Sequence, residues 1–510
     1  MMLKTSIENH LIIRADASTE IGIGHFMRCL ALAQGWKDAG GKVVFITACQ
    51  NEALLRRLRD EEFDIHLLAG AYPHAGDWDY TKNILTAYPG AWVVLDGYHF
   101  DETYQQQVKE LGHRLLVIDD MAHLKHYYAD IILNQNLHAQ QLQYSCEPHT
   151  RLLLGTRYVL LRQEFLTWKN WKRRTPEVAK RILVTLGGSD PRNHTLKAIQ
   201  ALQKVEVDGL EAIVVVGASN PYADVLETAI EQSHVPIRLL RNARNMPELI
   251  AWADTAVSTA GTTTWELLFL GTPILALISA YNQQQVAEQI QTHNVGKNLG
   301  EIDDMSMETL AETITLFLRD SDFRAKASEN GRRTVDGRGA QRVMALMQET
   351  EGLTVRLRLA TLDDCRMVWE WANEPAVRAA SFNSNPIEWD DHVGWFKGKL
   401  QTPSCLYYIA LNHMGLPIGQ VRFDTKGDKA EINISIGSGF RGCGFGPETI
   451  RTASERLFCQ TQVTRINANI KPENRASIHA FAKAGYKEVG VRLVKGEQAL
   501  EMTLEKHNGT

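Results

Sequence analysis

Short apolar runs alternate with helical stretches along the first half of the chain, and this alternation limits the possible folds more than any other feature. The runs LIIRAD, KVVFITA and AWVVLDGY begin at residues 11, 42 and 91, and helical stretches such as residues 25–40 and 51–62 lie between them. Strands that are apolar on both faces and separated by helices favour a parallel sheet covered on both sides. This part of the chain is therefore predicted to form a doubly wound α/β domain.

The same alternation restarts after a basic segment, residues 168–181. The runs RILVTLGGSD, LEAIVVVGAS and TPILALI begin at residues 181, 210 and 272. We expect two Rossmann-like domains in tandem, over residues 1–170 and 171–348, with the basic segment as a solvated linker between them. Because ligands of open α/β sheets bind beyond the carboxyl ends of the strands, the cleft between these domains is the first place to expect chemistry.

A third unit with a different pattern opens near Val355. A strand and a helix are followed by the runs CLYYIAL, IGQVRFD and EINISIG, which begin at residues 405, 418 and 431. Their spacing fits a meander of strands. The predicted fold class is thus α/β, with two Rossmann-like domains followed by an α+β domain over residues 353–507.

Charge and cysteine content exclude several classes of protein. The formal net charge of −5 gives no general attraction to nucleic acid or acidic membranes. The seven cysteines are scattered without C-x-x-C spacing, so neither a disulfide framework nor a metal site is predicted. The sequence contains no apolar run of the ~18 residues that span a bilayer, and its N-terminus lacks the apolar core of an export signal. We therefore expect a cytoplasmic protein without nucleic-acid or membrane partners.

The stretch IGIGHFMRC, residues 21–29, is the first candidate site. Gly22 and Gly24 stand between the first strand and a helix that begins near His25. Glycines let the backbone bend tightly and approach a ligand, and the free N–H groups of a helix N-terminus attract an anion. His25 titrates near neutral pH and is suited to take a proton from water. The alternative is a histidine that only caps the helix.

Two further turns follow strands of the second domain. One follows RILVTL and precedes a helix whose start is marked by Asn193, and the other is STAGTTTWE, residues 258–266. Such turns present backbone N–H groups to phosphate oxygens without a metal, although an ordinary strand-to-helix turn contains similar residues. The candidate contacts to phosphate are Gly187, Gly188, Ser189, Gly261 and Thr262.

Several motifs in the same order give the first two domains a resemblance to a known family. RADASTEIGIGHFMR, VLDGYHF, VIDDMA, LNQN, TLGGSDP and STAGTTTWELLFLGTPILAL together resemble the UDP-sugar hydrolase of pseudaminic acid biosynthesis, a relative of GT-B glycosyltransferases. The resemblance covers about residues 1–345. It implies a GT-B-like fold whose activity is the release of a sugar from UDP.

The resemblance also implies roles for individual residues. His25 is expected to be the catalytic base and Tyr98 its catalytic partner, whereas Asp16 is expected to orient the loop or His25. Glu266 is expected to accept hydrogen bonds from the ribose hydroxyls. From the residues alone, Tyr98 could equally be a packing residue and Glu266 a first-turn carboxylate that serves the helix dipole. The expected amide contacts to the sugar nucleotide are Asn134, Asn136, Asn282 and Gln283.

The stretch GFRGCGFGPETI, residues 439–450, resembles the acyl-CoA loop of the GNAT acetyltransferase superfamily. It lies between a predicted strand and a predicted helix and precedes INANIKPENRASIHAFAKAGYKEVG. The resemblance implies acetyl-CoA as the cosubstrate, with its pyrophosphate held by backbone N–H groups and a helix start. The expected contact residues are Ile434, Ile436, Arg441, Gly442, Gly444, Phe445, Gly446, Asn474 and Ser477.

The chain departs from the superfamily pattern at one catalytic position. Many members have a tyrosine that protonates the departing thiolate where this chain has Phe481, so that this role is unassigned. Glu431 is a candidate base acting through water, or else an exposed strand residue. Trp371, Asn373, Phe382 and His392 are candidates for the acceptor pocket, with core packing as the alternative for the tryptophan.

Both resemblances point to one pathway. The implied acetyltransferase acetylates the 4-amino group of a UDP-4-amino sugar, and the implied hydrolase removes UDP from the product, UDP-2,4-diacetamido-2,4,6-trideoxy-β-L-altrose. We therefore expect a bifunctional enzyme that uses acetyl-CoA and a UDP-linked amino sugar, without a metal. One alternative is a GT-B glycosyltransferase fused to an acetyltransferase with another acceptor. The other is a non-catalytic sugar-nucleotide-binding module tethered to an acetyltransferase.

Overall fold

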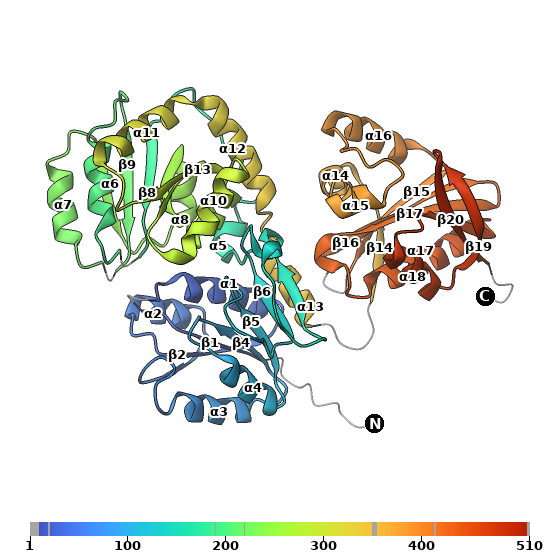
Figure 1. The fold of residues 1–510 in the computed structure, drawn as a ribbon, viewed down its shortest axis with the longest axis horizontal. Coiled ribbons are helices and arrows are strands. Elements are labelled where there is room, and N and C mark those ends of the chain that lie inside the picture. Colours follow the sequence, from blue (N-terminus) through green and yellow to red (C-terminus); the bar gives the residue numbers. More distant parts are fainter. Residues whose placement is uncertain are drawn as a thin grey trace. The chain divides into compact units, whose positions relative to one another are not determined.

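The computed structural model describes residues 10–18, 21–188, 190–218, 220–348, 354–412 and 415–506. The chain divides into two compact units, Met1–Met344 and Ala345–Thr510 (Figure 1). Across the described residues, no helix has both the length and the apolar composition needed to cross a bilayer.

The first unit opens with a seven-stranded sheet of order β3-β2-β1-β4-β5-β6-β7, in which every neighbouring pair is parallel. Its strands are β1 (His10–Ala15), β2 (Lys42–Thr47), β3 (Asp64–Leu67), β4 (Trp92–Asp96), β5 (Arg114–Ile118), β6 (Ile131–Asn134) and β7 (Arg151–Leu154). The helices α1 (Gly24–Asp38) and α2 (Glu52–Asp60) cover one face, and α3 (Asp77–Ala87) and α4 (Glu102–Glu110) cover the other (Figure 1). The predicted doubly wound domain is confirmed.

A second parallel sheet follows, with the order β10-β9-β8-β11-β12-β13. Its strands are β8 (Arg181–Thr185), β9 (Glu211–Val216), β10 (Ile237–Arg241), β11 (Thr255–Thr259), β12 (Ile274–Ile278) and β13 (Gly296–Glu301). Its helices are α6 (His194–Leu202), α7 (Ala223–Glu231), α8 (Met246–Trp252), α9 (Thr263–Phe269), α10 (Gln284–Thr292), α11 (Met307–Arg319) and α12 (Ser321–Thr334). In both sheets the strand order reverses beside the first strand, between β1 and β4 and between β8 and β11, where open α/β sheets bind ligands.

Two segments join these α/β domains. The short helix α5 (Gln163–Leu166) leads out of the first domain, and α13 (Gly339–Met347) returns to it, where Arg342 donates a hydrogen bond to the carbonyl of Arg157 at 2.7 Å. The basic segment between the sheets is not simply solvated, because Arg173 donates to the carbonyl of Ile250 at 2.7 Å and to Thr272 at 2.5 Å. Our prediction of a solvated linker is therefore wrong at Arg173, which fastens the segment to the second domain.

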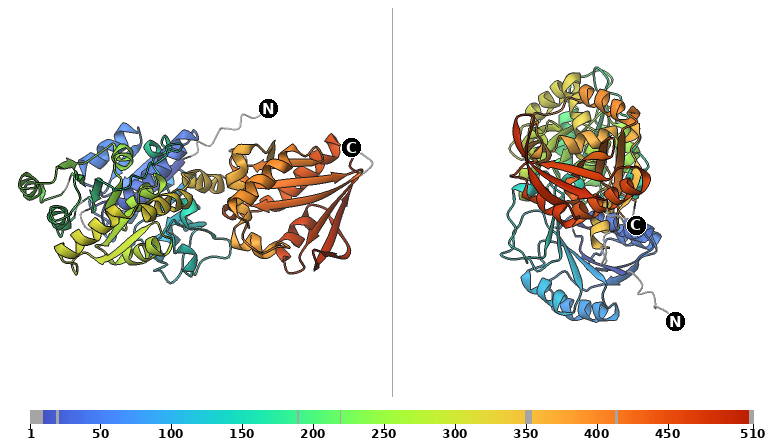
Figure 2. Two further views of the ribbon diagram at one scale, coloured as in Figure 1. Left: turned by 90° about the horizontal axis from the view of Figure 1, so that it is seen from above. Right: turned by 90° about the vertical axis from the view of Figure 1, so that its right-hand side faces the viewer.

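The second unit is built on a mixed sheet of order β14-β15-β16-β17-β18-β20-β19, antiparallel except for the parallel pair β17–β18. Its strands are β14 (Arg356–Leu359), β15 (Cys405–Leu411), β16 (Pro417–Lys426), β17 (Lys429–Ile436), β18 (Arg465–Ile470), β19 (Lys487–Val494) and β20 (Glu497–Glu505). Its helices are α14 (Cys365–Ala372), α15 (Pro375–Ala380), α16 (Trp389–Gln401), α17 (Phe445–Gln460) and α18 (Arg475–Lys483). Figure 2 shows the strands of this sheet fanning apart.

The two faces of this sheet are covered by different helices. Ile450 and Leu457 of α17 pack with Phe423 and Ile432 on one face. On the other face, α14 and α16 pack against β15. Short 3-10 helices complete the chain: η1 (Ala139–Gln141), η2 (Thr156–Tyr158), η3 (Tyr281–Gln283), η4 (Leu362–Asp364) and η5 (Ser438–Phe440).

Candidate active site

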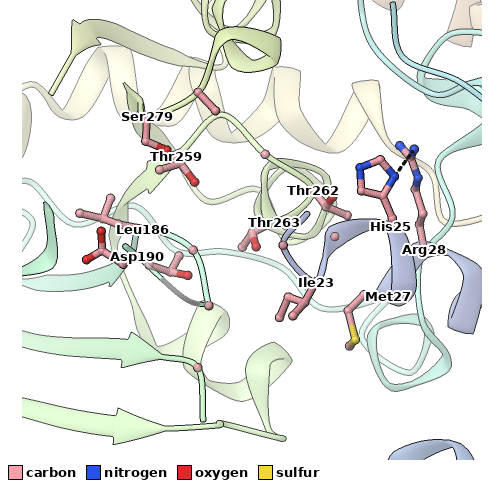
Figure 3. Close-up of a pocket in the computed structure, with 18 of the residues that line it drawn as sticks. Ile23, His25, Met27, Arg28, Leu186, Asp190, Thr259, Thr262, Thr263 and Ser279 are labelled. Carbon is pink, nitrogen blue, oxygen red and sulfur yellow. Dashed lines mark hydrogen bonds between the residues drawn. The ribbon is translucent and has the colours of Figure 1, made fainter. Parts of the chain in front are cut away.

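A cleft of about 790 Å³ lies between the two α/β domains of the first unit, at the carboxyl ends of both sheets (Figure 3). It brings together residues that lie far apart in the sequence, such as Gly22 and Asn282, which are 260 positions apart. The predicted site residues that line it are Gly22, Gly24, His25, Tyr98, Asn136, Gly187, Gly188, Gly261, Thr262, Glu266, Asn282 and Gln283. Ser189 lies outside the described residues.

His25 is oriented by a carboxylate that the sequence reasoning missed. It is the second residue of α1, and its Nδ1 lies 2.6 Å from Oδ1 of Asp96, the fully buried last residue of β4. Burial alone would raise the pKa of Asp96, but the charge of Arg28 and the bonds from Arg28 and His25 hold that pKa below its ordinary value. An ionised carboxylate only accepts hydrogen bonds, so Nδ1 carries the proton and Nε2 keeps its lone pair. His25 thus presents a free base nitrogen.

Arg28 holds the same carboxylate from the next turn of the helix. Its Nε lies 2.7 Å from Oδ2 of Asp96, and its Nη2 lies 2.7 Å from Oδ1 and 3.1 Å from Nδ1 of His25 (Figure 3). A guanidinium N–H and an imidazole N–H cannot donate to each other, so Asp96 is the acceptor that both share. The sequence contained one signal of this role, an acidic residue at the carboxyl end of a buried strand.

Asp16 was expected to orient the loop or His25; the second possibility is wrong because Asp16 makes no contact with His25, and the first stays a prediction. The carboxylate of Asp16 instead binds the Arg14 guanidinium at 2.5 Å, the backbone N–H of Ala48 at 2.7 Å and Nε2 of His99 at 3.1 Å. Among the described residues that line the cleft, Asp16 is absent.

Asp120 adds a second carboxylate, partly buried, on the other side of Arg28. Both of its oxygens lie 2.9 Å from Nη1 of Arg28, and Asn136 donates to it at 2.7 Å. Burial opposes its ionisation, but Arg28 outweighs burial and holds the pKa of Asp120 far below its ordinary range. Two carboxylates against one guanidinium leave a net negative charge, which would stabilise the imidazolium that forms when His25 takes a proton.

Tyr98 bridges the cleft rather than serving as a base. Its hydroxyl donates to Asp120 at 2.8 Å and accepts from Asn282, on the second domain, at 3.2 Å. Its ring meets that of His25 edge-on, with centroids 5.0 Å apart. Burial and the neighbouring Asp120 raise the pKa of Tyr98, so the phenol stays protonated. Its predicted place beside His25 agrees with this geometry, and its catalytic role stays a prediction.

Glycines let loops of the two domains touch across the cleft. A Cβ at Gly24 would lie 2.6 Å from Oγ1 of Thr262, and a Cβ at Gly188 would lie 3.2 Å from Cδ1 of Ile23. Gly187 has φ +99°, a backbone conformation that residues other than glycine rarely adopt. These loops therefore combine a tight turn with close backbone approach, as the sequence predicts.

Helix α6 begins where the sequence predicts it, directly after Asn193, but another residue caps it. Asn193 precedes the helix with φ +54° and makes no side-chain cap bond, whereas the Asp190 carboxylate accepts from the N–H groups of His194 at 2.9 Å and Thr195 at 2.8 Å. Asp190 thus caps the helix from four residues upstream. Because a carboxylate already occupies these N–H groups, the Gly187–Gly188 backbone is what remains to meet a ligand on this side of the cleft.

Glu266 faces the cleft from the first turn of α9. Its Oε1 lies 2.7 Å from Nη2 of Arg162, and both side chains are almost fully buried. Burial raises the pKa of Glu266 even though Arg162 opposes this. The predicted amide contact Asn134 is not among the described residues that line the cleft. Its side chain instead donates to the hydroxyl of Tyr144 at 2.9 Å.

The second candidate site lies where β17 and β18 separate. Lys429–Glu431 of β17 pair with Arg465–Asn467 of β18. Beyond these residues, the described parts of β17 and β18 are not paired with each other. Ile434 and Ile436 lie on the opened part of β17, as predicted for an acetyl-CoA contact. Glu431 is exposed.

The loop before α17 has the geometry of a backbone anion site. Gly444 immediately precedes the helix with φ +83°, and Gly442 has φ +76°. Arg441 donates from Nε to the Ile436 carbonyl at 2.8 Å and forms an ion pair with Glu374. Phe445 and Gly446 form the first turn of the helix.

Two of the expected acetyl-CoA contacts lie at the start of α18. Asn474 caps this helix by accepting from the N–H of Ser477 at 3.1 Å. Phe481 is buried, with its ring edge-on to Tyr486 at 5.0 Å. Of the suggested acceptor residues, Trp371 and His392 are buried, and Asn373 donates to and accepts from the backbone of Ile387. Phe382 lies under the ammonium group of Lys471.

The chain therefore contains two separate catalytic units. One has a glycine-lined cleft between two α/β domains, and the other has a mixed sheet that opens between two parallel strands. Residues 181–343 match the sequence model of the glycosyltransferase family 28 C-terminal domain. Residues 354–487 match that of the GNAT acetyltransferase domain. Among the described residues, no group of three or more His, Cys, Asp or Glu side chains is arranged to hold a metal ion.

Three curated proteins show what the chain is similar to. It is 23% identical over 496 residues to the uncharacterized protein MJ1062 of Methanocaldococcus jannaschii, covering 94% of this chain and 96% of that protein. It is 25% identical over 284 residues to the UDP-2,4-diacetamido-2,4,6-trideoxy-β-L-altropyranose hydrolase of Campylobacter jejuni, covering 54% and 94%. It is 27% identical over 184 residues to an aminoglycoside N(6′)-acetyltransferase type 1 of Klebsiella pneumoniae, covering 29% and 87%. The chain is therefore an enzyme that joins a unit similar to sugar-nucleotide hydrolases to a unit that matches the GNAT acetyltransferase model, and both resemblances are confirmed.

Proposed function

We propose that this enzyme performs two consecutive reactions on one UDP-linked amino sugar. The GNAT unit transfers an acetyl group from acetyl-CoA to the 4-amino group, and the first unit then hydrolyses UDP-2,4-diacetamido-2,4,6-trideoxy-β-L-altrose to the free sugar and UDP. The observation that carries the proposal is the His25–Asp96 pair in the glycine-lined cleft, in a chain similar to a hydrolase of this substrate.

The hydrolysis follows from the free nitrogen of His25. Nε2 takes a proton from a water molecule as the water oxygen attacks the anomeric carbon. The bond from that carbon to the diphosphate oxygen breaks, and its electron pair leaves with UDP. Asp96 and Asp120 stabilise the imidazolium, which then returns its proton to solvent. The backbone of the loops at Gly188 and Thr262 is available to bind the diphosphate.

The acetyl transfer needs mainly positioning. A neutral amine attacks the thioester carbonyl, the carbon–sulfur bond breaks, and the proton lost by nitrogen balances the thiolate of CoA. The loop from Gly442 to Gly446 and the start of α17 would hold the CoA pyrophosphate, and the opened edge of β17 would bind the pantetheine arm.

A second candidate function is favoured by the match to the glycosyltransferase family 28 domain. A glycosyltransferase would deliver the sugar to an acceptor other than water. It would therefore release UDP only when that acceptor is present, whereas a hydrolase releases UDP in water alone.

One experiment tests the proposal and separates the two candidates. The protein is incubated with UDP-4-amino-4,6-dideoxy-N-acetylaltrosamine, with and without acetyl-CoA, and the products are followed by NMR. We expect acetylation followed by the appearance of UDP and free sugar without any further acceptor. An acetylated sugar nucleotide that persists would overturn the hydrolase assignment.

Glu266→Gln is expected to weaken binding more than catalysis. A carboxylate that accepts hydrogen bonds from the ribose holds the ground state and the transition state alike, so its loss should raise KM by about tenfold and leave kcat nearly unchanged. Steady-state kinetics with the diacetamido sugar nucleotide measures both constants. Thermal unfolding of the variant checks that Arg162, which loses one of its two charged partners and keeps Glu164 at 3.2 Å, has not destabilised the fold. An unchanged KM with a collapsed kcat would place Glu266 in the chemistry instead.

A further inference from the structure

His99 lines the cleft but has no part in the proposed chemistry. It follows Tyr98 on the loop after β4, and its side chain is 19% exposed. Its Nε2 lies 3.1 Å from Oδ2 of Asp16, the carboxylate that the sequence assigned to His25.

Asp16 fixes which nitrogen of His99 carries the proton. The carboxylate also accepts from Arg14 at 2.5 Å and from the N–H of Ala48 at 2.7 Å. Burial opposes ionisation, but the bonds from His99, Arg14 and Ala48 outweigh it and lower the pKa of Asp16 to about 2. Because an ionised carboxylate only accepts, Nε2 of His99 donates to it, which leaves Nδ1 as the ring nitrogen that can accept a hydrogen bond.

The His99 ring is also held from two other sides. It packs on Phe100 with ring centroids 4.1 Å apart. A Cβ at Gly97 would lie 2.5 Å from Cε1 of His99 and 2.9 Å from its Nδ1, so the loop leaves space for the ring where any side chain would collide. A ring fixed by a hydrogen bond, an aromatic neighbour and a glycine has little freedom to turn. The ring therefore lines the cleft in a fixed orientation.

We infer that His99 recognises the hexose of the sugar nucleotide, with Nδ1 accepting a hydrogen bond from an uncharged N–H or O–H on the sugar ring. Asp16 acts through His99 as a positioning residue. The inference rests on the proposed hydrolysis, which puts the anomeric carbon beside His25. His99 lies on the loop after β4 and His25 in the first turn of α1, both in the first domain, whereas Gly187, Gly188 and Thr262 lie in the second, so we expect His99 to meet the sugar rather than the diphosphate.

The test compares two substitutions in the full-length chain. In His99→Gln the amide can reach the position of Nε2 and keep the contact with Asp16, but no atom replaces Nδ1. In His99→Asn the amide oxygen can take the position of Nδ1. Introducing each into His25→Ala prevents turnover, so calorimetry can measure the affinity for UDP-2,4-diacetamido-2,4,6-trideoxy-β-L-altrose and, separately, for UDP.

We expect His99→Gln to weaken binding of the sugar nucleotide about tenfold and to leave UDP binding unchanged, because one hydrogen bond to the sugar is lost. His99→Asn should restore most of the affinity. His126→Gln serves as the matched control, since His126 also faces a carboxylate, Glu147 at 3.1 Å, but is not among the described residues that line the cleft. A merely structural role for His99 would weaken UDP binding as well and would not be rescued by asparagine.

A second substrate identifies the donor on the sugar. If the donor is the 4-acetamido N–H, His99→Gln should reduce the preference for the diacetamido nucleotide over its 4-amino precursor. If it is a ring hydroxyl, both affinities should fall equally. Sugar-nucleotide affinity that stays within threefold in His99→Gln overturns the inference. These binding measurements need no turnover, so they test the inference separately from the proposed function. A wild-type protein that binds the nucleotide without releasing UDP would refute the proposed function, and the affinity of His99→Gln would still decide the inference.

Discussion

His25→Ala is expected to abolish UDP release while acetyl transfer continues at its normal rate. Loss of a general base typically lowers the rate by ~10²–10⁴-fold. The acetyltransferase reaction should be unaffected because His25 belongs to the cleft of the first unit and the second unit has its own hydrophobic core. Both activities can be followed in one NMR time course with the 4-amino sugar nucleotide and acetyl-CoA, where the acetylated nucleotide should accumulate.

Asp96→Asn is the companion variant that tests the origin of this effect. An asparagine has nearly the same shape but can donate to Nδ1 of His25, which would move the proton to Nε2 and remove the base. We expect a similar loss of hydrolysis with UDP affinity retained. Since Arg28 loses part of its counter-charge, the midpoint of thermal unfolding must be compared with that of the parent. Hydrolysis by His25→Ala within threefold of the parent rate would remove His25 from the mechanism.

Gly444→Val is expected to eliminate acetyl-CoA binding and to leave hydrolysis of a pre-acetylated substrate intact. Gly444 has φ +83°, which is a severe outlier for a β-branched residue, and it immediately precedes α17 where the pyrophosphate is expected. The loop must therefore change shape, and the backbone N–H groups lose their arrangement. Calorimetry with acetyl-CoA measures the effect directly.

Gly427→Val provides the control for backbone strain. Gly427 also has a positive φ, +62°, but it lies in the turn between β16 and β17, and a Cβ there would meet nothing within 4 Å. This variant should bind acetyl-CoA normally although it carries a comparable strain. Undiminished affinity in Gly444→Val would show that RGCGFG is only a turn.

The sequence predicts the sheets more fully than the site. Apolar runs such as those of β4 and β12 identify central strands because both faces of such a strand are buried. The edge strand β13, with the sequence GKNLGE, was not predicted, because its two glycines and its polar residues lack that pattern. At the end of the chain, β19 and β20 form a pair of strands joined at a turn that contains Gly496.

Within the site, the glycine loops and His25 are recognisable because their residue types are unusual between a strand and a helix. The role of Asp96 is not, because it depends on α1 crossing the end of β4 so that residues 71 positions apart meet. Asp16 was assigned to the wrong histidine for the same reason: a short separation along the chain does not reveal which ring its carboxylate faces. Asp190 likewise acts as a cap only because the turn folds back over the start of α6.

The hydrogen bond from Asn282 to Tyr98 joins one α/β domain to the other across the cleft. Neither α/β domain contains a whole hydrolase, so a gene that encoded only one of them would confer no hydrolysis. The acetyltransferase unit stands under no such constraint, since its sheet and helices form their own core. Fusion and fission of genes can therefore add or remove that unit freely, whereas the two α/β domains must be inherited together.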